Sequence, residues 1–474
     1  MVEEKSEIKH SRTRQKPKDK MQVFKETQLP FIIALTAAIL ILIFIIGSIS
    51  NAVKRHKITK EAQQATSQQT AMDKKSLDKL VAELLDQAEA GIEQYGYDTA
   101  LTLLEPVAEH ADKYPQLKKK LQEYNEALAT MVAWDDPSKI VNLSFQMLIA
   151  DPSLAFTNDT YGKSLNQNYL TTEEFTAILT QLYENGYVLV NNSDLFTTEA
   201  SPDGTIITKA KTVYLPIEKR PIAITQTNVN YNYYLIDSDD DKLPDQNGCG
   251  FASKLVLENG TITNEMVDKN GDTVRGNFDL IPILESFVAE HPDFSYQGSK
   301  ATVAVTGYDG LFGYRTAASD KERLGDAYTQ EVAQATEIAQ WLRDNGYDLA
   351  CYTYRNMAYG AATLEQVQND LEQWNEEVTP LIGQVDILVY AQNSDISAST
   401  GYTGDLFDLL KNNGFRYYLG FSDGGAWATL TDDYARHGRI LVSGASLKHH
   451  SDWYIGVLDP SNILDATRGE VPNL

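Results

Sequence analysis

From about Lys139 onward, short apolar segments alternate with longer amphipathic ones, and this alternation restricts the chain to few architectures. The apolar segments predict strands at 141–146, 187–190, 221–225, 301–306, 347–351, 386–390 and 416–420. Helical spacing predicts helices at 171–184, 279–290, 329–344, 363–378 and 403–413. Strands that alternate with helices favour an α/β fold with a sheet or a barrel at its centre.

The N-terminal part has the pattern of a membrane anchor. Residues 1–28 form a basic tail, with eight Lys and Arg against five Asp and Glu in residues 1–29. An uncharged run at 29–50 has the roughly 20 residues that a helix needs to span a bilayer. A cleaved signal peptide is the alternative, although its apolar part is usually shorter. We predict an uncleaved single-pass anchor with a cytoplasmic N-terminus and an extracytoplasmic C-terminal domain.

Three further segments complete the predicted organisation. Residues 51–76 predict a spacer, 77–132 a helical hairpin stalk similar to one tetratricopeptide unit, and 451–474 a C-terminal tail. The net charge of −25 disfavours nucleic acid as a partner, because an acidic surface repels phosphates. Cys249 and Cys351 are predicted to be separate thiols, with a disulfide as the alternative.

Residues 139–450 resemble the polysaccharide deacetylase family, also called the NodB-homology domain or carbohydrate esterase family four. The resemblance rests on framework segments and on the glycine-led strand before the family's second motif: 145–156, 182–190, 291–296, 307–315 and 345–356. It is greatest to a membrane-anchored branch from Gram-positive bacteria. The resemblance implies a distorted (β/α)7-type barrel with its site at the carboxyl ends of the strands.

The family's chemistry is metal-assisted hydrolysis of N-acetyl groups on sugars. One Asp acts as base on a metal-bound water, a second Asp and two His hold a divalent metal such as zinc, and a later His acts as acid. Here the base position is Thr227, and the ligand positions are Asn228, Tyr352 and Asn356. A threonine cannot take a proton at neutral pH, and a neutral amide is a weak ligand. The resemblance therefore implies the barrel but not the reaction, and we predict no metal cofactor.

Three more positions depart from the family pattern. Gln146 ends the early strand where relatives have His, Ala391-Gln392-Asn393 stands in the third motif, and 439–444 occupies the place of the late Leu-x-His strand. We predict a catalytically inactive homologue that binds cell-wall polysaccharide, peptidoglycan or a wall-associated partner.

Polar and aromatic residues near these motifs are the candidate glycan ligands. Tyrosine faces stack on sugar rings, and side-chain amides pair with hydroxyl groups. The candidates are Asn230, Tyr231, Tyr314, Arg315, Tyr352, Tyr354, Gln392 and Asn393. Each of them is equally compatible with a side chain that only fills a vacated cavity.

Two other functions stay open. An active hydrolase of N-acetyl sugars with a relocated site would draw on the remaining histidines and two carboxylates of the domain: His291, His437, His449, His450, Asp309 and Asp395. A calcium-stabilised structural or adhesive protein would use four acids with the spacing of a calcium loop: Asp237, Asp239, Asp241 and Asp245. Lys242 and Gly248 break that loop pattern, so a solvated acidic turn is the competing interpretation.

Overall fold

The computed structural model describes residues 74–202, 204–237, 245–246, 248–397, 401–465 and 468–473. The predicted cytoplasmic tail (1–28), the predicted anchor (29–50) and the predicted spacer up to residue 73 lie outside these residues. Within the described ranges, no helix has both the length and the apolar character needed to cross a bilayer.

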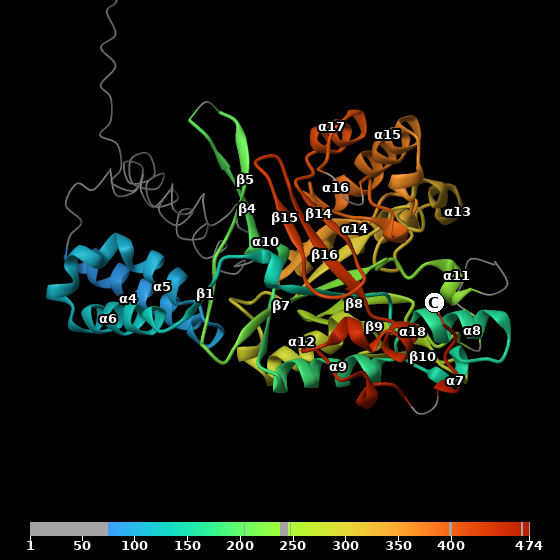
Figure 1. Cartoon of the computed structure of the whole chain (residues 1–474), viewed down its shortest axis with the longest axis horizontal. Coiled ribbons are helices and arrows are strands. Elements are labelled where there is room, and N and C mark those ends of the chain that lie inside the picture. Colours follow the sequence, from blue (N-terminus) through green and yellow to red (C-terminus); the bar gives the residue numbers. More distant parts are fainter. Residues whose placement is uncertain are drawn as a thin grey trace, which may run out of the picture. The chain divides into compact units, whose positions relative to one another are not determined.

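The centre of the fold is a closed barrel of seven parallel strands (Figure 1). In chain order they are β2 (Val141–Phe145), β7 (Arg220–Thr227), β11 (Ala301–Val305), β12 (Tyr347–Cys351), β13 (Ile387–Val389), β14 (Tyr417–Ser422) and β16 (Ala435–Leu441). Around the barrel the order is β11-β12-β13-β14-β16-β2-β7, and pairing of β7 with β11 closes it. The predicted α/β barrel is confirmed.

One further parallel strand belongs to the same sheet but not to the ring. β3 (Tyr187–Val190) pairs with the first half of β7, in the register Val190 to Ala223. β11 pairs with the second half of β7 from Thr225 onward. Because both strands use the same edge of β7, β3 lies outside the ring of seven.

Helices cover the outside of the barrel, with α9 and α12 on one side and α14 to α17 on another (Figure 1). Their bounds are α9 (Thr172–Glu184), α12 (Leu280–Glu290), α14 (Ala327–Asp344), α15 (Leu364–Gln373), α16 (Thr379–Ile382), α17 (Asp405–Asn412) and α18 (Gly444–His449). A capping box formed by Thr171 and Glu174 begins α9, with both reciprocal hydrogen bonds present. The helix predicted at 363–378 is α15 followed by a π-helical turn at Trp374–Val378.

Shorter helices lie in the connections between strands. They are α7 (Pro152–Ala155), α8 (Thr160–Asn168), α10 (Asn192–Leu195), α11 (Tyr233–Ile236) and α13 (Lys321–Leu324).

Side chains along each barrel strand alternate between the interior and the helices. The interior contains small and branched residues, among them Ala223, Ala304, Ala350, Val389 and Leu419. Residues of the opposite parity pack against the surrounding helices in the larger core. The barrel is thus a packed core and not a pore.

Several antiparallel strands were not predicted. β4 (Phe196–Ala200) and β5 (Ile206–Ala210) form a hairpin, β1 (Val132–Trp134) pairs with β6 (Val213–Leu215), and β15 (Ala428–Leu430) pairs with β16. β8 (Lys254–Glu258), β9 (Thr261–Val267) and β10 (Thr273–Gly276) form a three-stranded sheet. The turn between β8 and β9 is Asn259-Gly260, with φ of 52° and 81°. An Asn-Gly pair is a strong hairpin signal, so the sequence did carry this information.

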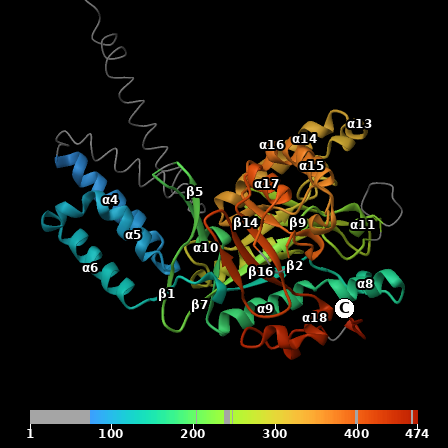
Figure 2. The ribbon, with the colours of Figure 1, turned by 45° about the horizontal axis from the view of Figure 1, so that its top comes forward.

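The predicted stalk is helical and has a small core of its own. α4 (Lys74–Ala90), α5 (Tyr97–Leu104) and α6 (Pro115–Ala129) lie side by side (Figures 1 and 2). Hydrogen bonds join this segment to the loop before β11: Tyr95 Oη donates to the Asp293 carbonyl at 2.9 Å, and Gln297 Nε2 donates to Asp98 Oδ1 at 2.8 Å. The three helices are therefore attached to the barrel domain.

Two further predictions can be compared with the structure. The described residues after 450 do not form a separate tail, because Tyr454 and Arg468 are buried against the barrel. Cys249 and Cys351 are free thiols, as the simpler of the two interpretations predicted.

Candidate functional site

The candidate site lies at the carboxyl edge of the barrel, where the positions of the family motifs come together. Thr227 ends β7, Tyr352 follows β12, and Gln392 and Asn393 follow β13. Arg439 lies near the end of β16, at one of the alternate positions of that strand that face the barrel interior. Parallel strands end at the same edge, so residues distant in the sequence share this site.

The side chains at the base position and at the first ligand position form hydrogen bonds within the protein. Thr227 Oγ1 donates to the Phe145 carbonyl at 3.2 Å, which ties β7 to β2. Asn228 Oδ1 accepts from Asn232 Nδ2 at 2.7 Å, and Asn228 Nδ2 donates to Tyr234 Oη at 2.9 Å. Neither side chain offers a negative oxygen to a proton or to a cation.

The other two ligand positions also fail to fit a divalent metal. Tyr352 is half-buried against the apolar interior of the barrel, beside Arg439. The Asn356 carbonyl accepts from Gln392 Nε2 at 2.8 Å, and Asn356 Oδ1 is buried without a partner. A neutral amide oxygen and a phenol beside a guanidinium are a poor donor set for a cation. In the described part of the chain, no three His, Cys, Asp or Glu side chains gather as metal ligands would.

Arg439 is the functional candidate that the sequence reasoning missed. Its guanidinium is buried, with Nη1 donating to Ser144 Oγ at 3.0 Å. Nη2 donates to the Tyr390 carbonyl at 2.7 Å and to Asn393 Oδ1 at 3.2 Å. Burial lowers the pKa of Arg439, and the neighbouring Tyr352 partly offsets that shift. The signal in the sequence was a lone charge that begins an otherwise apolar run, Arg439-Ile-Leu-Val.

Aromatic rings lie around the same edge. Phe421 of β14 pairs in register with Arg439 of β16. Trp453 packs edge-on against Phe421, with ring centroids 5.9 Å apart, and His450 stacks on Trp453 at 4.4 Å. Phe421, Trp453 and His450 are half-buried, so parts of their surfaces are open to solvent.

Tyrosines form a second aromatic group beside the first motif. Tyr234 and Tyr161 are both exposed, and Tyr161 Oη donates to the Tyr234 carbonyl at 2.8 Å. Burial raises the pKa of Tyr169, and its neighbours Tyr234, Tyr161 and Tyr352 add to that rise. These tyrosines are therefore close to one another at the barrel edge.

The loops of the site hold an unusual backbone conformation. Asn228, Thr353, Asn356, Gln392 and Asn393 have φ between 53° and 62°, in the left-handed region. Asparagine adopts this region readily, but threonine and glutamine do so at a cost. Thr353 is held there by its own side chain, because Thr353 Oγ1 accepts from the Met357 amide at 2.6 Å. Strained residues on three neighbouring loops are typical of a functional site.

The structure brings only three of the eight predicted glycan ligands, Tyr352, Gln392 and Asn393, to this edge with part of their surface exposed. The other five are buried and bonded within the protein: Asn230 to Thr306, Tyr231 to Asp279, Tyr314 to the Leu255 carbonyl, Tyr354 to Glu377, and Arg315 to the Asp309 and Tyr231 carbonyls. Since a ligand would have to break these contacts, we leave the five out of the candidate site.

The residues proposed for a relocated hydrolytic site do not come together. His437 lies inside the barrel with Nε2 2.7 Å from the Ile140 carbonyl, and burial lowers its pKa to about 4. His291 packs between Tyr183 and Phe287, while His449 Nε2 lies 3.0 Å from the Val471 carbonyl. The carboxylates are also committed, since Asp395 pairs with Arg436 at 2.8 Å and Asp309 accepts from the Tyr233 amide.

The predicted calcium loop falls largely outside the described residues. Asp239 and Asp241 are not among them. Asp237 ends α11 and is buried, and the Asp245 amide donates to the Ile236 carbonyl at 2.7 Å. The calcium hypothesis therefore stays a prediction.

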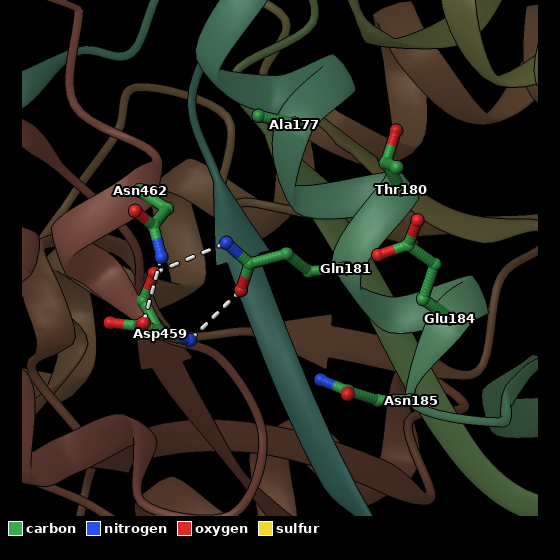
Figure 3. A pocket seen from close by; sticks show the side chains of 7 residues that line it. All are labelled: Ala177, Thr180, Gln181, Glu184, Asn185, Asp459 and Asn462. Carbon is green, nitrogen blue, oxygen red and sulfur yellow. Dashed lines mark hydrogen bonds between the residues drawn. The ribbon is translucent and has the colours of Figure 1, made fainter.

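A separate hollow of about 570 Å³ lies on the outer face of α9 (Figure 3). Figure 3 shows its lining of Ala177, Thr180, Gln181, Glu184, Asn185, Asp459 and Asn462. Gln181 Nε2 donates to the Asp459 carbonyl at 3.2 Å, and the Asp459 amide donates to Gln181 Oε1 at 2.9 Å. α9 ends where β3 begins, so this hollow is near the amino edge of the barrel and contains none of the motif positions.

Comparison with protein-family models gives no match, and comparison with curated protein sequences gives none either. Among solved structures, the chain is similar to the Streptococcus pyogenes deacetylase PplD in complex with acetate. The two are 13% identical, the match covers 67% of this chain and 99% of that chain, and the TM-score is 0.35. A likeness at this level fixes neither a reaction nor its residues. The barrel described above rests on the strand pairing alone.

Proposed function

We propose that the protein is a catalytically inactive, deacetylase-like barrel that binds glycan at its carboxyl edge. One observation carries this proposal: the positions that hold base and metal in the resembled family carry neutral side chains, and two of them are bonded within the protein. Exposed amides and half-buried aromatic rings surround these positions. Rings that stack on sugar faces and amides that pair with hydroxyls suit a glycan.

The sequence supports an extracytoplasmic location for this domain. The basic tail and the apolar run at 29–50 predict a membrane anchor, which would hold the barrel near the cell wall. The ligand would then be wall polysaccharide or peptidoglycan, and neither a metal nor another cofactor would be required.

The test is binding of chitotetraose, a neutral oligomer of N-acetylglucosamine, to the full-length protein by titration calorimetry. Replacing Tyr352 with Ala removes the one aromatic side chain at the second motif that is half-buried at the edge, so we expect at least a tenfold loss of affinity. Tyr214→Ala is the matched control, because Tyr214 is also half-buried but lies on β6. Equal losses for the two variants, or no binding by the unmodified protein, would reject the proposal.

The same preparation distinguishes an inactive binder from an active hydrolase. We expect no release of acetate from chitotetraose when zinc is added, because Thr227 cannot act as a base. We also expect no transition metal in a fixed ratio to the purified protein. Zinc-dependent acetate release would establish a hydrolase instead.

A further inference from the structure

Arg439 places a positive charge inside the carboxyl end of the barrel without a partner of opposite charge. It is 1% exposed, and no carboxylate of the described residues forms an ion pair with it. Two other buried arginines differ in this respect, since Arg436 pairs with Asp395 and Arg468 pairs with Glu174, whereas Arg315 is held by the Asp309 and Tyr231 carbonyls. A buried cation that is not neutralised is costly, so its retention calls for an explanation.

The hydrogen-bond partners of Arg439 are all neutral. Ser144 Oγ, the Tyr390 carbonyl and Asn393 Oδ1 accept from its two Nη atoms. The Nε–H group is buried and has no partner. The guanidinium therefore has donor capacity left over, in addition to its unbalanced charge.

Asn393 is the partner that a ligand could replace most easily. Its side chain is exposed, and its 3.2 Å contact is the longest that Arg439 makes. Asn393 and its neighbour Gln392 both have a left-handed backbone, on the loop that follows β13. Gln392 is joined to the next loop through the Asn356 carbonyl, and Asn356 Oδ1 is a second buried polar atom there without a partner.

We propose that Arg439 recognises the carboxylate of an acidic sugar, so that the ligand is a glycan containing a uronic acid. The carboxylate displaces Asn393 Oδ1 and accepts charge-assisted hydrogen bonds from the guanidinium, including Nε–H. Phe421, which pairs in register with Arg439, and Trp453 beside it supply apolar faces for the sugar ring. This inference rests on the proposed glycan-binding function and specifies its ligand.

The experiment compares two tetrasaccharides that differ only at the carboxyl groups. The acidic probe alternates glucuronic acid with N-acetylglucosamine, and the control is the same oligosaccharide with its carboxyl groups reduced to alcohols. Binding to the full-length protein is measured by titration calorimetry. We expect the acidic probe to bind at least tenfold more tightly, because only its carboxylates can neutralise Arg439.

Three variants test whether Arg439 causes the preference for the acidic probe. Arg439→Gln should reduce binding of the acidic probe at least tenfold and change binding of the reduced probe less than threefold. Asn393→Asp places a carboxylate of the protein beside the guanidinium, and it should abolish the preference for the acidic probe. Arg355→Gln removes an exposed arginine from the loop after β12 and should leave the preference unchanged.

The outcomes separate this inference from the proposed function. If both probes bind equally well, recognition of a carboxylate is rejected and glycan binding stands. If neither probe nor chitotetraose binds, the proposed function fails as well. If N-acetylglucosamine 6-phosphate displaces the acidic probe as strongly as glucuronic acid does, the site binds anions in general, and specific recognition of a carboxylate is rejected. If Arg439→Gln does not fold, Asn393→Asp decides, because position 393 is exposed.

Discussion

The carboxylate of Glu174 and the guanidinium of Arg468 form a buried ion pair across 294 residues of sequence. Their side chains are 0% and 2% exposed, and Arg468 Nη2 lies 2.7 Å from Glu174 Oε2. The same Glu174 oxygen accepts from the Thr171 amide and completes the cap of α9. Arg468 also donates to Asn166 Oδ1 at 2.8 Å, so the C-terminal segment is fastened to both α8 and α9.

Loss of Arg468 should strongly destabilise the barrel. Arg468→Ala leaves the Glu174 carboxylate buried and unpaired, and we expect the free energy of unfolding to fall by about 3–5 kcal/mol. Urea denaturation measures the change. Glu173→Gln is the control on the same helical turn, since Glu173 is exposed, and it should cost less than about 0.5 kcal/mol. A cost below about 1 kcal/mol for Arg468→Ala would mean that the buried ion pair contributes little to stability.

Asp348, at the amino half of β12, should make stability fall as the pH rises. Burial raises its pKa to about 7, and the charge of Asp194 adds to the rise, while the Ser193 amide at 2.8 Å opposes it. The folded state then holds a proton that the unfolded state, with an Asp pKa near 3.9, has already released. Stability contributed by the protonated form is therefore present below about pH 4 and lost as the pH rises to about 7.

Asp348→Asn tests this prediction, because an amide cannot ionise. We expect the variant to gain about 3 kcal/mol relative to the unmodified protein when the pH is raised from 4.5 to 8. The difference between the two proteins isolates Asp348 from His437, whose lowered pKa acts in the opposite direction. Asp452→Asn, at an exposed position, should give no such difference. If the stability difference between the variant and the unmodified protein does not change with pH, Asp348 is already ionised in the folded protein.

Tyr231 should matter for stability and not for glycan binding. Its hydroxyl donates to Asp279 Oδ2 at 2.9 Å and accepts from Asn264 Nδ2 at 2.9 Å, all fully buried. Tyr231→Phe leaves both partners short of a hydrogen bond, which should cost about 1–3 kcal/mol in denaturation experiments. Chitotetraose affinity should stay within about twofold. Weaker binding at unchanged stability would return Tyr231 to the candidate site.

The two thiols should differ from ordinary exposed cysteines in reactivity. Burial raises the pKa of the Cys249 thiol to about 11, and it raises that of the Cys351 thiol as well. Because the thiolate is the reactive form, we expect both to react slowly with a thiol reagent at pH 8 in the folded protein. When the protein is denatured in the absence of a reducing agent, both thiols should react rapidly. No rapidly reacting thiols under those conditions would indicate a disulfide.

Much of the central sheet could be predicted from the sequence because its strands are buried on both faces. The predicted segments 187–190 and 347–351 agree with β3 and β12, and each follows an Asn-Gly pair that ends a helix. The hairpin strands were missed because few of their residues are buried, and only alternate residues of β9 are. Their pattern is weaker than that of a continuous apolar strand.

By itself, the sequence determined which chemical groups the motif positions offer. Thr227, Asn228, Tyr352 and Asn356 lack basic carboxylates and imidazoles in any fold, because residue identity alone fixes that property. Only the tertiary structure decided which polar side chains a ligand could reach. Tyr354 and Tyr352 are two residues apart, yet one is hydrogen-bonded to Glu377 in the core and the other is half-buried beside Arg439. Burial and pairing depend on neighbours hundreds of residues away, and the closed barrel brings those neighbours together.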